Sequence, residues 1–360
     1  MNLLTTEDII GILRSDLPRI APSLVAAREN SIASVEQRKT LAKPDDALAR
    51  SLRDSLTLSS AFIVPEFKAK LDAVTLYTVD APEIGALARQ RRGKPEIILF
   101  AGLLRYIQFF FEMIAIGSLL QAIRPDAKVS DGLDGHHEES FLFLLACQVL
   151  MTAFVEKGSE PPRLNDLLGE NISNSIATGF NGALCFLLLH ELGHIELGHT
   201  RLSGHAEPLT SPLLLDEAMS TERLQEFEAD GFALGGITPR FRAGLISSLI
   251  HLFGGFAMLE AFTGALGARH PLSLNRLNRL AEACDLDETE RRVTTDFVNA
   301  RLAFFRQLQP HREAANGSVS ERIYQVMSVS HALNIIAEVK RRVAHDHGSL
   351  DRSPISSTGL

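Results

Sequence analysis

The chain has 360 residues, of which 45% are hydrophobic and 22% are charged, and its formal net charge is −8. This is the composition of an ordinary globular protein with room for one large domain or two small ones. The acidic balance repels phosphate backbones, so we expect no nucleic-acid partner, and we expect the short basic cluster at residues 89–92 to be a solvated turn. Cys147, Cys185 and Cys284 are widely spaced in apolar or helical contexts, which predicts reduced core thiols.

The N-terminal region is predicted to be helical. It lacks the basic segment and long apolar run of a secretory signal, so we expect a cytoplasmic protein. Thr5 and Asp8 form a capping signal for the first of several amphipathic helices within residues 6–60. A small sheet, built on residues 73–79 and 95–101, is expected to follow.

Three apolar stretches, at residues 97–123, 141–155 and 243–268, raise the question of a membrane. A membrane-spanning helix needs about 20 apolar residues with few charges. The first and third stretches contain Glu112 and Glu260, and the second is too short. We therefore favour buried core helices over membrane association, which stays the alternative.

The segment Phe186–His199 is an apolar helix that carries the pattern His-Glu-x-x-His. Four residues make about one helical turn, so His190 and His194 share a face and can bind one metal ion. Glu191 projects beside the metal, where it can take a proton from metal-bound water. His199 follows His194 by five residues, too far round a helix to join the ligands, so we expect it to be structural or to support a ligand.

A catalytic zinc ion takes three protein ligands and leaves one position for water. The candidates for the third ligand follow the loop at residues 203–220. Glu226 and Asp230 are four residues apart and share a helix face. We expect Glu226 to bind the metal, because it is the only glutamate of this segment with an aspartate four residues later. We expect that aspartate, Asp230, to accept the N–H of a ligand histidine. Glu222 lies one turn earlier on that face, and Glu228 is expected to point elsewhere.

His-Glu-x-x-His followed by Glu-x-x-Ala-Asp resembles the gluzincin metallopeptidases. Residues 74–88 and 96–104 resemble the paired strands before the active helix in the HtpX-like and CAAX-protease family. His270-Pro271 with Arg276 resembles the later His-Pro element of that family.

The chain also departs from that family. Gly85-Ala86-Leu87 stands where Asn-Ala-Phe is usual, and Glu226 follows His194 by a short spacing. The short ligand spacing and the intracellular character of the sequence are closer to the Lit-type phage-exclusion peptidases and the ImmA/IrrE-like regulators. Many HtpX-like proteins are membrane-embedded, so the resemblance gives a membrane-embedded location as the alternative.

The same resemblance implies that His270 hydrogen-bonds the oxyanion of a tetrahedral intermediate. A helix-capping or packing role for His270 is the alternative. Arg276 either pairs with a carboxylate near the site or is solvated.

We predict a mainly α zincin-like metallopeptidase fold with a small β-sheet and extra N- and C-terminal helices. The predicted parts are an N-terminal helical region (1–60), a catalytic domain (61–285), a C-terminal helical region (286–346) and a disordered tail (347–360).

The predicted function is a zinc-dependent endopeptidase that acts on a protein or peptide. One Zn²⁺ per chain is held by His190, His194 and Glu226, and Glu191 is the general base for metal-activated water. Residues 95–101 are expected to form the sheet edge along which an extended substrate pairs. The alternative is a zinc-binding regulator or sensor that acts on a partner by binding, with little or no proteolysis.

Overall fold

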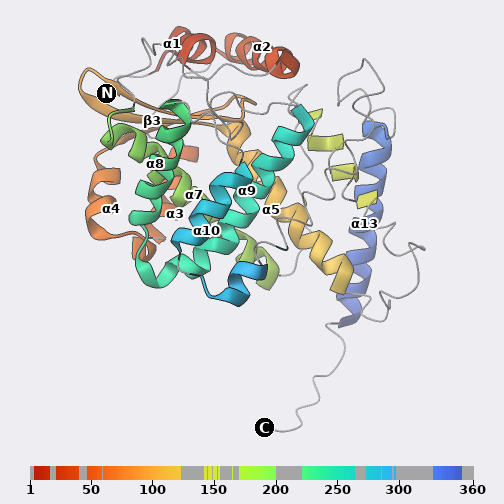
Figure 1. Cartoon of the computed structure of the whole chain (residues 1–360). Helices are drawn as coiled ribbons and strands as arrows, with labels where there is room; N and C mark the ends of the chain where they lie inside the picture. The colour runs from red at the N-terminus through yellow and green to blue at the C-terminus, as the bar shows by residue number, and fades with distance from the viewer. Residues whose placement is uncertain are drawn as a thin grey trace, which may run out of the picture.

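The described part of the chain is mainly helical with one small sheet, as the sequence predicts (Figure 1). The computed structural model describes residues 4–16, 22–39, 47–58, 60–122, 142–143, 145–147, 149–151, 153–154, 164, 170–199, 221–263, 273–284, 286–293, 296 and 327–350.

The sheet has three strands in the order β1-β3-β2. They are β1 (Thr75–Val79), β2 (Ala86–Arg91) and β3 (Lys94–Phe100). β1 pairs with β3 in parallel, and β2 pairs with β3 in antiparallel. Arg92 and Gly93 join β2 to β3 with φ values of 53° and 76°, the left-handed conformation that a two-residue hairpin turn requires.

One expectation about this sheet is wrong, and a second is correct only in part. The strand predicted at residues 95–101 is the central strand, because β2 pairs with the side that was expected to be free. The basic cluster is only partly a solvated turn: Arg92 lies in the hairpin turn and is exposed, whereas Arg89 and Arg91 lie in β2. The Nε atom of Arg89 donates to Glu96 at 3.0 Å, and Nη2 of Arg91 donates to Asp8 at 3.3 Å.

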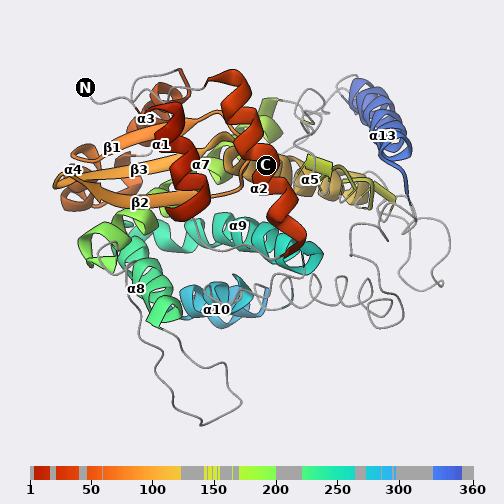
Figure 2. The ribbon, with the colours of Figure 1, turned by 90° about the horizontal axis from the view of Figure 1, so that it is seen from above.

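Both faces of the sheet are covered, which explains the uninterrupted apolar run of β3. Side chains on one face join the main core beneath the sheet. They include Leu76, Ile97 and Leu99. Side chains on the other face pack against the N-terminal helices, which Figure 2 shows lying across the strands. They include Val79, Ile98 and Phe100.

The N-terminal region is helical, as predicted. Thr5 caps the first helix through a capping box: its hydroxyl accepts from the Asp8 amide at 3.1 Å, and the Asp8 carboxylate accepts from the Thr5 amide at 3.0 Å. The elements before the sheet are α1 (Thr6–Gly11), η1 (Ile12–Asp16), α2 (Pro22–Arg38), α3 (Ala47–Leu58), η2 (Ser60–Phe62) and α4 (Pro65–Asp72).

The helices after the sheet surround α7 (Glu170–Glu196), which contacts α5, α8, α9 and β2. Residues 183–189 of α7 are all buried, as expected of a helix that is apolar all round. The other elements are α5 (Ala101–Ala122), α8 (Thr221–Gly235), η5 (Pro239–Phe241), α9 (Arg242–Thr263), α10 (Ser273–Ala283) and α13 (Val329–Leu350). α13 continues past residue 347 to Leu350, and the four predicted parts of the chain stay predictions.

The described parts of the three apolar stretches are largely buried, as expected. The buried carboxylate of α5 is satisfied inside the protein, because Glu112 accepts from the Leu164 amide at 2.9 Å and from Gln108 at 2.9 Å. Among the described helices, Ser173–Glu196 of α7 alone is long and apolar enough to cross a membrane by length and composition, and most of it is buried inside the protein. A core helix has the same properties. The three cysteines are buried and free, as predicted.

Candidate metal centre

Helices α7 and α8 bring three potential metal ligands together. His190 Nε2 lies 3.1 Å from His194 Nε2 and 3.4 Å from Oε2 of Glu226. His194 Nε2 lies 3.5 Å from Oε1 of Glu226. In the part of the chain that the structure describes, this is the one group of three or more His, Cys, Asp or Glu side chains that could hold a metal ion.

The spacing of these atoms fits a tetrahedral zinc ion. With metal–ligand bonds of about 2.0–2.1 Å, two ligand atoms of a tetrahedral site lie about 3.3–3.4 Å apart. In this protein the two histidine nitrogens lie 3.1 Å apart, and they lie 3.4 and 3.5 Å from two different oxygens of the Glu226 carboxylate, Oε2 and Oε1. The donor set of two imidazoles and one carboxylate also suits zinc, and it leaves the fourth position open.

Gly193 allows the two helices to approach closely enough for this geometry. It lies between the two histidines of α7 and faces α8. A β-carbon at Gly193 would lie 3.1 Å from Cα of Ala229 and 3.2 Å from Cβ of Phe232. Glu226, one turn before Ala229 on α8, therefore depends on this close packing to reach the histidines.

The second ring nitrogen of His190, Nδ1, contacts the buried ion pair of Asp230 and Arg276. His190 Nδ1 lies 2.9 Å from Oδ1 of Asp230. Arg276 of α10 donates to both oxygens of Asp230, from Nε at 2.8 Å and from Nη2 at 2.7 Å, and its Nη1 lies 3.2 Å from Glu226. The Arg276 guanidinium also lies over the ring of Phe253 at 5.0 Å. Of the two alternatives for Arg276, pairing with carboxylates near the site is confirmed.

The second ring nitrogen of His194, Nδ1, contacts another histidine, His199. His194 Nδ1 lies 3.1 Å from Nδ1 of His199, and Nε2 of His199 lies 3.0 Å from Oε2 of Glu228. Glu228 was expected to point away from the site, and it reaches the site through His199. The sequence allowed a supporting role for His199 but did not reveal its partner.

The charges around the site shift the pKa values of its members. Burial alone would lower the pKa of His190, but hydrogen bonds to Asp230 and Glu226 outweigh burial and raise it to about 9. Burial alone would raise the pKa of Asp230, but Arg276 and His190 hold it below its usual value. Burial and the neighbouring His194 lower the pKa of His199. The raised pKa of His190 therefore reflects carboxylates on both sides of its ring, Asp230 at Nδ1 and Glu226 at Nε2.

The charge balance also fits a divalent cation. Glu191, Glu226 and Asp230 are buried carboxylates, and Arg276 is the guanidinium that contacts two of them. The formal charges of these four groups sum to −2 when the histidines are neutral. Buried charges require compensation, and one bound divalent cation would supply the two missing positive charges.

Residues 155–296 match the family model described as Peptidase U49. The match supports a peptidase function. It covers less than half of the 360 residues, but it includes α7, α8 and α10, which carry the candidate ligands and Arg276. No curated protein and no solved structure matches the chain. The resemblances to the HtpX-like and ImmA/IrrE-like proteins stay predictions.

Some predicted site features lie outside the described residues. They are His270-Pro271, the loop at residues 203–220 and the side chain of Glu222. The oxyanion role of His270 therefore stays a prediction.

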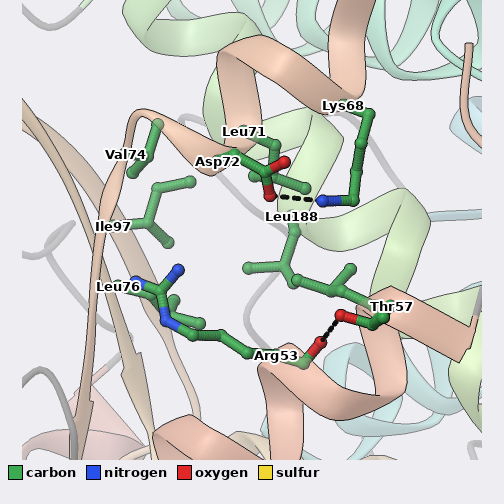
Figure 3. A pocket seen from close by; sticks show the side chains of 10 residues that line it. Arg53, Thr57, Lys68, Leu71, Asp72, Val74, Leu76, Ile97 and Leu188 are labelled. Carbon is green, nitrogen blue, oxygen red and sulfur yellow. Dashed lines mark hydrogen bonds and ion pairs between the residues drawn. The ribbon is translucent and has the colours of Figure 1, made fainter. Parts of the chain in front are cut away.

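A cavity of about 220 Å³ lies on another side of α7 (Figure 3). Figure 3 shows the Lys68–Asp72 ion pair and Arg53 beside apolar side chains that include Ile97 and Leu188. Leu188 is the one α7 residue that lines the cavity. None of the candidate ligands lines it, so the cavity is separate from the metal centre.

Proposed function

We propose that this protein is a zinc-dependent endopeptidase that hydrolyses peptide bonds of a protein substrate. The observation that carries the proposal is the close approach of His190 Nε2, His194 Nε2 and the Glu226 carboxylate: the two nitrogens lie 3.1 Å apart, and each lies 3.4–3.5 Å from one carboxylate oxygen. A neutral His190 keeps its proton on Nδ1, where Asp230 accepts it, and therefore turns a lone pair towards the other donors. A metal cation bound between these electron-rich atoms would stabilise them at this separation.

Zinc bound by these three residues would lower the pKa of water and polarise a peptide carbonyl. Glu191 follows the first ligand on α7, is buried, and is not one of the three ligands. Its carboxylate accepts the proton of the attacking water and delivers that proton to the amide nitrogen of the leaving group. Asp230 and Arg276 hold the His190 ring in the orientation that ligation needs.

The sheet suggests where a substrate lies. β2 is an edge strand of the sheet and contacts α7, whereas β3 is central. An extended peptide added to the free edge of β2 would form main-chain hydrogen bonds that place little demand on sequence. We therefore assign to β2 the substrate-pairing role that the sequence suggested for residues 95–101.

Metal analysis of the purified full-length protein tests the proposal. We expect about one zinc per chain in the wild type and none in a His190→Ala/His194→Ala double variant. Cleavage of an unfolded protein substrate should stop with a chelator and return on addition of zinc. Stoichiometric zinc in the double variant, or cleavage unchanged by the chelator, would contradict the proposal.

A further inference from the structure

His199 lies against His194 because α7 ends between them. The last residue of α7 is Glu196, and Gly198 follows with φ of +79°, the left-handed conformation that commonly ends a helix. The Gly198 amide donates to the carbonyl of Ile195 at 3.2 Å. The chain therefore turns back, and the ring centroids of His194 and His199 lie 5.2 Å apart. On a continuous helix, a spacing of five residues would have separated the two side chains by about 140°.

The hydrogen bonds of this segment fix the position of each proton. An ionised carboxylate only accepts, so the Nε2–H of a neutral His199 donates to Glu228 at 3.0 Å. His199 Nδ1 then has a lone pair, and it accepts the Nδ1–H of His194 at 3.1 Å. The ring of His194 is thereby left with an unprotonated Nε2, which faces His190 and Glu226.

We propose that His199 and Glu228 form a positioning relay that holds His194 in the tautomer and orientation required for metal binding. The inference rests on the proposed metallopeptidase function and extends it to residues that do not touch the metal. The relay is the counterpart of Asp230 and Arg276, which act on His190 from the opposite side of the ligand pair.

The two supports differ in burial. The side chain of Asp230 is 4% exposed and that of Arg276 is 11% exposed. In the relay, the side chain of His199 is 8% exposed, but that of Glu228 is 49% exposed. Solvent weakens the contribution of Glu228. Supporting residues of this kind typically contribute about 10–100-fold in metal affinity, so we expect His199 to lie in that range and Glu228 to lie at its lower end.

The test measures zinc affinity by chelator competition and requires no peptidase substrate. Glu228→Ala removes the terminal acceptor and should weaken zinc binding about 10-fold, whereas Glu228→Gln keeps an acceptor and should restore most of the affinity. His199→Phe keeps a ring and removes both hydrogen bonds, and it should weaken binding by about 10–100-fold. Because both residues act through one chain of hydrogen bonds, Glu228→Ala should add little to His199→Phe.

Two matched controls separate the relay from general effects of substitution. His251→Phe changes a histidine of α9 whose ring contacts Phe111, and Glu66→Ala removes an exposed carboxylate of α4. Both controls should retain wild-type zinc affinity. The cobalt-substituted protein gives a second readout: its visible absorption should shift in His199→Phe and stay unchanged in His251→Phe.

The outcomes distinguish this inference from the function on which it rests. Wild-type zinc affinity in both Glu228→Ala and His199→Phe would overturn the relay and leave the metallopeptidase proposal standing. If the losses of zinc affinity from Glu228→Ala and His199→Phe were fully additive in the double variant, the relay would also be overturned. If His199→Phe does not fold, the contrast between Glu228→Ala and Glu228→Gln decides, because Glu228 is half exposed. A wild-type protein that binds no zinc would overturn the proposed function and the relay together.

Discussion

Arg276 should contribute strongly to the stability of the metal-free protein, because it is the cation that neutralises two buried carboxylates. Its side chain is 11% exposed, and those of Asp230 and Glu226 are 4% and 10% exposed. At a charge separation of about 4 Å and an effective dielectric constant of about 20, one such ion pair is worth about 4 kcal/mol. Removing one partner of a buried pair typically costs about 3–5 kcal/mol. Arg276→Gln should therefore lower the free energy of unfolding by that amount.

Urea unfolding of the zinc-free protein at pH 7, followed by circular dichroism, measures this effect. Arg279→Gln is the matched control on the same helix, because Arg279 is exposed and lies over the ring of Phe227 at 4.0 Å. An exposed cation–π contact is worth about 0.5–1 kcal/mol, so the control should lose no more than that. If Arg276→Gln lost as little as the control, the electrostatic account of the site would be refuted.

Two further predictions concern the proposed zinc ligands and their packing. Glu226→Ala removes a proposed ligand and should abolish tight zinc binding, whereas Asp230→Asn should lower zinc affinity by only about 10–100-fold. Chelator competition measures both affinities. A greater loss of zinc affinity in Asp230→Asn than in Glu226→Ala would make Asp230 the ligand and Glu226 the supporting residue. Gly193→Ala places a methyl group 3.1 Å from Cα of Ala229 and should weaken zinc binding about 10-fold by displacing α8. The control Gly231→Ala, where a β-carbon meets no atom within 4 Å, should leave zinc affinity unchanged and stabilise the protein by about 0.5–1 kcal/mol.

The helical half of the site could be predicted from the sequence because it depends on local periodicity. A spacing of four residues fixes the shared face of His190 and His194, and the same rule applies to Glu226 and Asp230. The structure brings these side chains together as that rule predicts. The apolar runs of the helices and of β3 likewise predicted which segments are buried.

The features that the sequence did not reveal depend on tertiary contacts. β2 has no alternating apolar pattern, and its two arginines are neutralised by Glu96 and Asp8, which lie on β3 and α1. Without β2, β3 could not be recognised as the central strand. His199 was placed by extending the helix beyond its true end. Gly198 was the available signal, because a glycine just after a helix commonly adopts the left-handed conformation.

The most direct test of the central claim compares zinc-loaded wild type with Glu191→Gln for the appearance of new protein N-termini in cells. The substitution keeps the shape of the side chain and removes the base, so zinc content should stay equal in the two proteins. We expect cleavage to fall at least 10²-fold in Glu191→Gln, because proton transfer typically contributes about 10²–10⁴-fold. New N-termini that appear equally with both proteins at equal zinc content would contradict a peptidase that uses Glu191 as its base.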